Sequence, residues 1–218
     1  MKKIIDIKVS VSKSSAVEAK CDVLVVGVFE DQKTDRICGQ LDRKLGGAIS
    51  KVGQLGDFKG EHATTALVYT TGKLKAQRIM LVGLGKKNDL TADKLRKAAS
   101  VAALNAVNIK AGYIAVTLGH ELQEKIDTQT AAQVITEGLH FGGYRYDEFV
   151  SEAEKKRSAV LKASLLESDQ RKMSSISKGI KIGSILGSCQ NYTRTVANRP
   201  GNIINPPELA KEIGKSVV

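Results

Sequence analysis

The chain has 218 residues, 42% of them hydrophobic and 26% charged, and this balance excludes an intrinsically disordered protein. No apolar run approaches the roughly 18 residues that span a bilayer, and the charge of Asp6 comes too early for the apolar core of a signal peptide. The formal net charge of +11 suits a nucleic acid or an acidic partner, but no basic run is interleaved with aromatic residues, so we interpret the charge as a lysine-rich solvated surface.

Five short apolar runs predict β-strands. The run 4–9 alternates like a half-buried strand and is followed by serines that we place in a polar turn. The run 22–29 is continuously apolar and β-branched, which is typical of a strand covered on both faces. The remaining predicted strands occupy residues 64–70, 78–84 and 113–118.

Helical patterns lie between these strands. Residues 35–45 form a short helix that ends at Gly46 and Gly47, and Thr91 is a good N-cap for a helix that runs to Val107. Asp127 caps a third helix, which ends near Gly142. Strands and helices that alternate at this spacing predict an α/β sandwich with a mixed, largely parallel sheet.

The composition changes after residue 149. Residues 159–166 fit either a late strand or the start of a helix, and periodicity does not decide between them. From 169 to 198 the apolar residues recur at helical intervals, at Ile176, Ile180, Leu186, Cys189 and Val196, which predicts a long amphipathic helix. The segment 205–208, Asn-Pro-Pro-Glu, begins another helix with Asn as its cap. This helix is still running at Val218, so we expect a truncated polypeptide.

Three cysteines, Cys21, Cys38 and Cys189, lie far apart and form no C-x-x-C pair. Their number and spacing exclude a disulfide framework and a zinc site, and indicate buried thiols in a reducing compartment. We therefore expect a cytoplasmic protein.

The residues that carry chemistry in other proteins form no recognisable site here. His62, His120 and His140 stand outside any H-E-x-x-H pattern, and we interpret each as a surface or packing residue. The turn from Gly83 to Lys86 lacks the third glycine of a dinucleotide loop, and neither a G-x-S-x-G elbow nor an acidic cluster for two metal ions is present. We predict no catalytic and no metal-binding residue in this chain, and we leave its binding residues unassigned.

Three segments carry a resemblance to known proteins. Residues 191–210 read NYTRTVANRPGNIINPPELA, and residues 137–147 read EGLHFGGYRYD, with Phe141 and Tyr146 at an apolar and a Phe position of the compared pattern. Residues 78–86 form a strand and turn. Together these segments resemble the N-terminal half of the leucyl aminopeptidase family, the M17 metallopeptidases, and the resemblance covers essentially the whole chain.

The resemblance implies a three-layer, macro-domain-like α/β domain over residues 1–168. A linker helix and the start of a catalytic domain follow over residues 169–218. Members of the family remove N-terminal residues from peptides with two divalent metals, Zn or Mn, and form hexamers. Their catalytic signatures, such as Asn-Thr-Asp-Ala-Glu-Gly-Arg, do not occur here. The resemblance therefore implies an inactive N-terminal domain that serves assembly, access or regulation, and whose linker helix exposes an apolar stripe when the catalytic domain is missing.

Two alternatives stay open at this point. A macro-like fold suits an ADP-ribose-type ligand, with Gly46 and Gly47, or Gly83 and Gly85, near its phosphates at the carboxyl end of a strand. The same glycines fit helix caps and turns equally well. The second alternative is a basic regulatory domain that binds DNA through backbone electrostatics, with an affinity that falls steeply with salt.

Overall fold

A computed structural model describes residues 7–31, 36–117, 122, 124–150 and 162–216. Its sheet has six strands in the order β1-β6-β5-β2-β4-β3. The strands are β1 (Lys8–Lys13), β2 (Val23–Phe29), β3 (Thr65–Tyr69), β4 (Arg78–Gly85), β5 (Tyr113–Thr117) and β6 (Lys162–Glu167). Only β3, at one edge, runs antiparallel to its neighbour, so the mixed, largely parallel sheet is confirmed.

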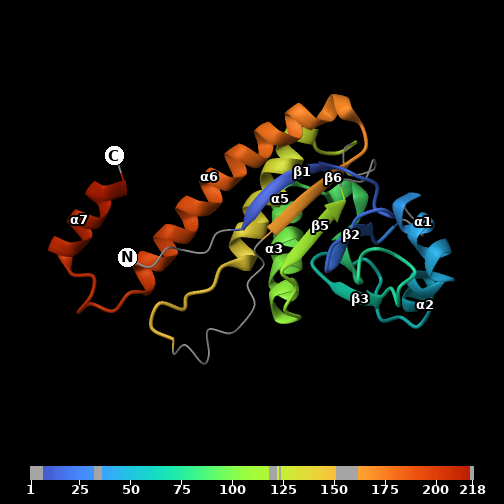
Figure 1. Cartoon of the computed structure of the whole chain (residues 1–218), viewed down its shortest axis with the longest axis horizontal. Coiled ribbons are helices and arrows are strands. Elements are labelled where there is room, and N and C mark those ends of the chain that lie inside the picture. Colours follow the sequence, from blue (N-terminus) through green and yellow to red (C-terminus); the bar gives the residue numbers. More distant parts are fainter. Residues whose placement is uncertain (1–6, 32–35, 118–121, 123, 151–161, 217–218) are drawn as a thin grey trace.

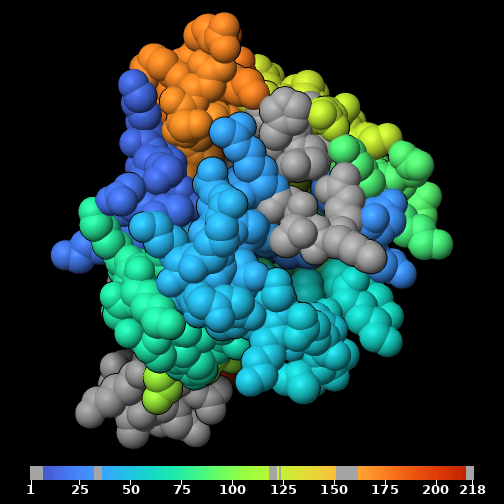
Figure 2. Space-filling model, turned by 90° about the vertical axis from the view of Figure 1, so that its right-hand side faces the viewer, coloured from blue at the N-terminus to red at the C-terminus, as the bar shows by residue number. Residues whose placement is uncertain are grey.

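Helices cover both faces of this sheet (Figure 1). Strand β2 shows why: Val23 and Val25 join a core with α3 (Ala92–Asn108) and α5 (Thr128–Gly143), whereas Leu24 and Val26 join a core with α1 (Arg36–Leu45) and α2 (Ala48–Gln54). Side chains of a strand alternate between faces, so a continuous apolar run needs two cores. The expected strand with two covered faces is therefore confirmed. Figure 2 shows α1 and α2, in light blue and cyan, across the end of the molecule that lies beside β3.

Two segments differ from the sequence expectations. Residues 4–6 of the expected strand 4–9 lie outside the described residues, and β1 occupies Lys8–Lys13, so Ser10 and Ser12 lie in a strand and not in a polar turn. The Ser10 hydroxyl lies 3.3 Å from that of Ser164 on β6. The ambiguous segment 159–166 contributes β6, which pairs in parallel with both β1 and β5. Its strand state comes from these two partners, which are remote in sequence.

The predicted long helix is confirmed as α6 (Met173–Asn198), and glycines make up much of its buried face. Gly179, Gly183 and Gly187 are buried against α5 together with Ile176 and Ile180. On the outer side, Ile182, Ile185 and Leu186 are exposed. The exposed Leu186 agrees with the expected exposed stripe, whereas the expectation of a buried Cys189 was wrong, because the close contact with α5 is made by glycines.

Helix α7 (Pro206–Ser216) follows α6 after a short turn and lies at the end of α6 away from the sheet (Figure 1). Its N-cap is Asn205, as predicted, because the Asn205 side chain accepts a hydrogen bond from the backbone of Glu208 at 3.1 Å. Within the described part of the chain, no helix combines the length and apolar character needed to cross a membrane.

Candidate functional site at the junction of three helices

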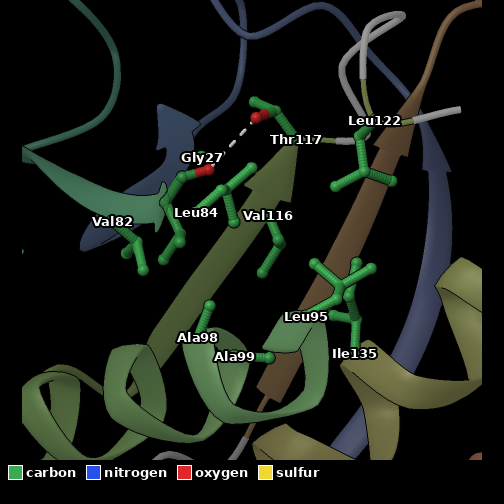
Figure 3. A pocket seen from close by; sticks show the side chains of 11 residues that line it. Gly27, Val82, Leu84, Leu95, Ala98, Ala99, Val116, Thr117, Leu122 and Ile135 are labelled. Atoms are coloured by element: carbon green, nitrogen blue, oxygen red, sulfur yellow. Dashed lines mark hydrogen bonds between the residues drawn. The ribbon is translucent and has the colours of Figure 1, made fainter. Parts of the chain in front are cut away.

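The carboxyl edge of the parallel strands is where open α/β sheets usually bind ligands. Here that edge contains a small apolar cavity between β2, β4, β5 and helices α3 and α5 (Figure 3). It holds about 30 Å³ of open space, which is room for roughly two water molecules, whereas ligand pockets run to several hundred Å³. Its lining is almost entirely aliphatic, and the Thr117 hydroxyl is already bonded to the Val25 carbonyl at 3.3 Å. The cavity as it stands does not fit a nucleotide.

The turn at Gly83 and Gly85 is occupied by the protein's own backbone. The amide of Gly83 donates to the carbonyl of Thr64 at 2.9 Å, and the amide of Gly85 donates to that of Gly60 at 3.0 Å. A Cβ atom at Gly83 would lie 1.8 Å from the carbonyl oxygen of Glu61. These glycines therefore allow a loop to cross close to β4, and their amides do not face a phosphate.

The pair Gly46 and Gly47 ends α1. Both residues have positive φ, 68° and 86°, and Gly47 donates to the carbonyl of Asp42 at 2.9 Å. This is the C-cap geometry that glycine favours. The turn-and-cap interpretation of both glycine pairs is thus the one that the geometry supports.

The two described histidines have structural positions. The His62 ring nitrogen Nε2 lies 2.9 Å from the carbonyl oxygen of Lys94, which ties a loop to the start of α3. His140 is buried where α6 crosses α5, and a Cβ at Gly187 would lie 2.5 Å from its Cβ. His120 lies outside the described residues. Among the residues that the structure describes, no group of three or more His, Cys, Asp or Glu side chains is placed to hold a metal ion.

The segments 137–147 and 191–210, which are about 50 residues apart in sequence, meet in space. Asn191 donates to the carbonyl of His140 at 3.1 Å, and Arg194 donates to that of Phe141 at 3.0 Å. Both carbonyls belong to the last turns of α5, where helix carbonyls lack intrahelical partners. Side chains of α6 therefore cap the C-terminal end of α5.

Arg194 contacts two aromatic rings. Its guanidinium carbon lies 4.5 Å from the ring centre of Phe141 and 4.0 Å from that of Tyr144, a cation–π contact with each ring. Burial lowers the pKa of Arg194, although the rings and the carbonyl keep the charged form in place. The Tyr144 hydroxyl in turn lies 3.1 Å from that of Thr195. This contact fixes the chain that leaves α5.

A buried ion cluster completes the junction. Arg199 donates twice to the Glu148 carboxylate, from Nε at 2.8 Å and from Nη2 at 3.2 Å, and its Nη1 lies 3.5 Å from Glu212 of α7. The side chain of Arg199 is only 5% exposed. The hydrogen bond to Glu148 raises the pKa of Arg199 more than burial lowers it. The guanidinium thus connects the segment after α5, the end of α6 and α7.

The other side of the 137–147 segment contacts α3. Glu137 accepts a hydrogen bond from Arg96 at 2.6 Å, and a Cβ at Gly142 would lie 1.9 Å from the carbonyl oxygen of Ser100. Sequence reasoning identified both segments but missed that they pack together, and it did not identify Glu148 or Glu212. For Glu212, the sequence shows only a carboxylate on an amphipathic helix, which does not indicate a buried ion pair.

Residues 25–153 match the model of the "Cytosol aminopeptidase family, N-terminal domain". A curated relative, a probable cytosol aminopeptidase of Sulfurihydrogenibium sp. (strain YO3AOP1), is 31% identical over 202 residues, which are 90% of this chain and 39% of that protein. The chain thus spans about two fifths of the length of the curated relatives that it matches.

Among solved structures, a mutant of tomato leucine aminopeptidase superposes with a TM-score of 0.82 at 23% identity, covering 99% of this chain and 43% of that one. The bottromycin maturation enzyme BotP, solved in complex with Mn, gives a TM-score of 0.61 at 18% identity over 89% of this chain and 36% of its own. The macrodomain of Mycobacterium tuberculosis DarG gives 0.56 at 11% identity over 75% of this chain and 99% of its own. These likenesses are likenesses of fold, and they confirm the macro-like sheet.

Proposed function

We propose, because the chain belongs to the cytosol aminopeptidase family through its N-terminal domain, that it is the non-catalytic part of a metal-dependent enzyme that removes N-terminal residues from peptides. The observation that carries the proposal is the match to the family's N-terminal domain, together with the two-fifths share of the relatives' length. In this proposal the catalytic and metal-binding residues lie outside this chain. Residues 1–168 then form the domain, and residues 169–218 form the linker helix and the approach to the catalytic part.

The metals of the proposed enzyme are two divalent ions, Zn or Mn, bound outside this chain. The Mn complex of the fold relative BotP supports a divalent metal in proteins of this architecture. We propose further that the whole protein is cytoplasmic, acts on peptides and assembles as a hexamer. We propose that this domain contributes to assembly of the hexamer, to substrate access or to regulation. The contacts at the junction of α5, α6 and α7 support such a role, because they hold the three helices in one arrangement.

The test compares this chain with the full-length polypeptide from its source. Hydrolysis of leucine p-nitroanilide is measured for both, with Mn²⁺ or Zn²⁺ and then after chelation. We expect the full-length protein to be active, to lose activity with the chelator and to regain it with metal, and we expect this chain to be inactive under all conditions. Activity in this chain would refute its non-catalytic role, and an inactive full-length protein would refute the enzyme assignment.

The size of the natural polypeptide is an independent check. An antibody against this chain should detect a product more than twice as long, since the chain spans about two fifths of its relatives. A natural product that ends near Val218 would remove the peptidase proposal and leave a stand-alone domain.

An ADP-ribose-binding role is less well supported by the geometry. The amides of Gly83 and Gly85 are already bonded to carbonyls of the chain, and the nearby cavity is small and apolar. We expect no change in melting temperature with millimolar ADP-ribose. A clear upward shift would show that the macro-like fold has kept a ligand site.

A further inference from the structure

Helix α7 is attached to the domain in an unusual way. Of its residues 206–214, whose exposure is described, only Glu212 is buried, at 7% exposure. The apolar side chains of Leu209 and Ile213 remain 38% and 52% exposed. A helix that docks on a domain normally buries its apolar stripe. In the described part of α7, by contrast, the buried side chain is the carboxylate of Glu212.

The partner of this carboxylate comes from the residue that directly follows α6. Arg199 is the C-cap residue of α6, and its guanidinium bonds Glu148 in bidentate fashion while Nη1 lies 3.5 Å from Glu212. Tyr192 of α6 adds a hydrogen bond from its hydroxyl to the backbone carbonyl of Glu212 at 3.3 Å. Both contacts meet α7 at a single residue, one on its side chain and one on its backbone.

The turn between the helices restricts the same geometry. The amides of Ile203 and Ile204 both bond the carbonyl of Pro200, at 2.9 and 3.0 Å, and Asn205 caps α7. Exposed ion pairs contribute little to stability, but loss of one partner from a buried pair leaves an uncompensated charge. The pair Lys211–Glu208 of α7 is of the exposed kind, and Arg199–Glu212 is of the buried kind.

We propose that Arg199 is a positioning residue of the whole enzyme: by bonding Glu148 and Glu212 together, it fixes the direction in which α7 leaves α6 and in which the polypeptide continues toward the catalytic part. The inference rests on the proposed function, because it assigns to the junction the placement of that part. Leu209 and Ile213 of α7 remain exposed in this arrangement.

The experiment removes one charge from α7 and leaves the core of the domain untouched. Glu212→Gln is compared with Glu208→Gln, a matched change on the same helix at a residue whose ion pair with Lys211 is exposed. Amide hydrogen exchange of residues 208–216 is measured by mass spectrometry in the full-length polypeptide and in this chain. We expect at least tenfold faster exchange of α7 in Glu212→Gln, with unchanged exchange in α5, and wild-type exchange in Glu208→Gln.

A charge reversal supplies the second measurement. Arg199→Glu should lower kcat/KM of the full-length enzyme at least threefold, and the double variant Arg199→Glu with Glu212→Arg should recover part of the loss, because it restores opposite charges across the contact between positions 199 and 212. Unchanged α7 exchange in Glu212→Gln, or a double variant no better than Arg199→Glu alone, would overturn the inference. An inactive wild-type enzyme would refute the proposed function instead, and the exchange measurement would still decide whether Arg199 holds α7.

Discussion

Replacing Gly183 by alanine tests how closely α6 lies on α5. A Cβ at this position would lie 2.5 Å from the carbonyl oxygen of Gln133 and 2.8 Å from the Cβ of Thr136. Ordinary contacts of a Cβ begin at 3.4 Å, so the backbones would have to separate by about 0.9 Å at this point. A gap of that size forfeits roughly a quarter to a half of the dispersion energy between the facing atoms.

Two opposing effects set the magnitude. Alanine is favoured over glycine inside a helix by up to about 1 kcal/mol, whereas overpacking against a rigid backbone costs about 1–3 kcal/mol and sometimes more. The neighbouring contacts at Gly179 and Gly187 are equally close, so α6 has no room to shift along the seam. We expect Gly183→Ala to lower the free energy of unfolding by about 2 kcal/mol.

The assay is urea unfolding followed by circular dichroism at 222 nm, where a loss of about 2 kcal/mol lowers the midpoint by roughly 1 M. The control is Gly39→Ala in α1, a helical glycine whose added Cβ would meet nothing within 4 Å. This variant should be more stable by about 0.5–1 kcal/mol. If Gly183→Ala also unfolds at the wild-type midpoint or above it, the reasoning about the seam is refuted.

Asp127→Ala should cost about 1 kcal/mol at pH 7, because Asp127 caps the first turn of α5. Hydrogen bonds of that turn lower the pKa of Asp127, so its contribution is present above its unfolded pKa of about 4 and is lost as the pH falls below that value. The urea midpoints of variant and wild type should therefore converge near pH 3, and a constant gap would contradict the cap. At pH 8 a thiol reagent should modify exposed Cys189 quickly and Cys21 only after unfolding, because burial raises the pKa of the Cys21 thiol to about 12. In sedimentation velocity the chain should self-associate through the exposed Ile182 and Ile185. Ile185→Glu should be monomeric, and a monodisperse wild-type monomer would count against this surface.

Local signals in the sequence predicted the helix starts correctly. The side chain of Thr91 accepts a hydrogen bond from the Lys94 amide at 3.2 Å, and that of Asp127 accepts one from Thr130 at 3.0 Å. Each contact joins residues three positions apart, so the pattern that predicts it lies within one turn of chain. The strand at 22–29 was predicted equally well, because a continuous apolar run without alternation indicates a strand that is buried on both faces.

The family resemblance was also present in the sequence, in the segments 137–147 and 191–210. The sequence did not show why those residue types occur in these two segments. Asn191 and Arg194 bond carbonyls of α5 that lie more than 50 positions earlier, and Arg199 meets Glu148 in the same way. No local period encodes such pairs, so only the packed structure shows that the two segments form one junction.

The sequence by itself determined the alternation of strands and helices, the helix caps and the family, because each depends on a pattern within a short window of chain. The tertiary structure decided which face of α6 is buried, whether residues 162–167 form a strand, and what the glycines do. The sequence does not distinguish the roles of Gly83 and Gly183. Gly83 lies against a crossing loop, whereas Gly183 lies against a neighbouring helix. The reason is physical: a glycine is selected by what approaches it, and the approaching backbone comes from elsewhere in the chain.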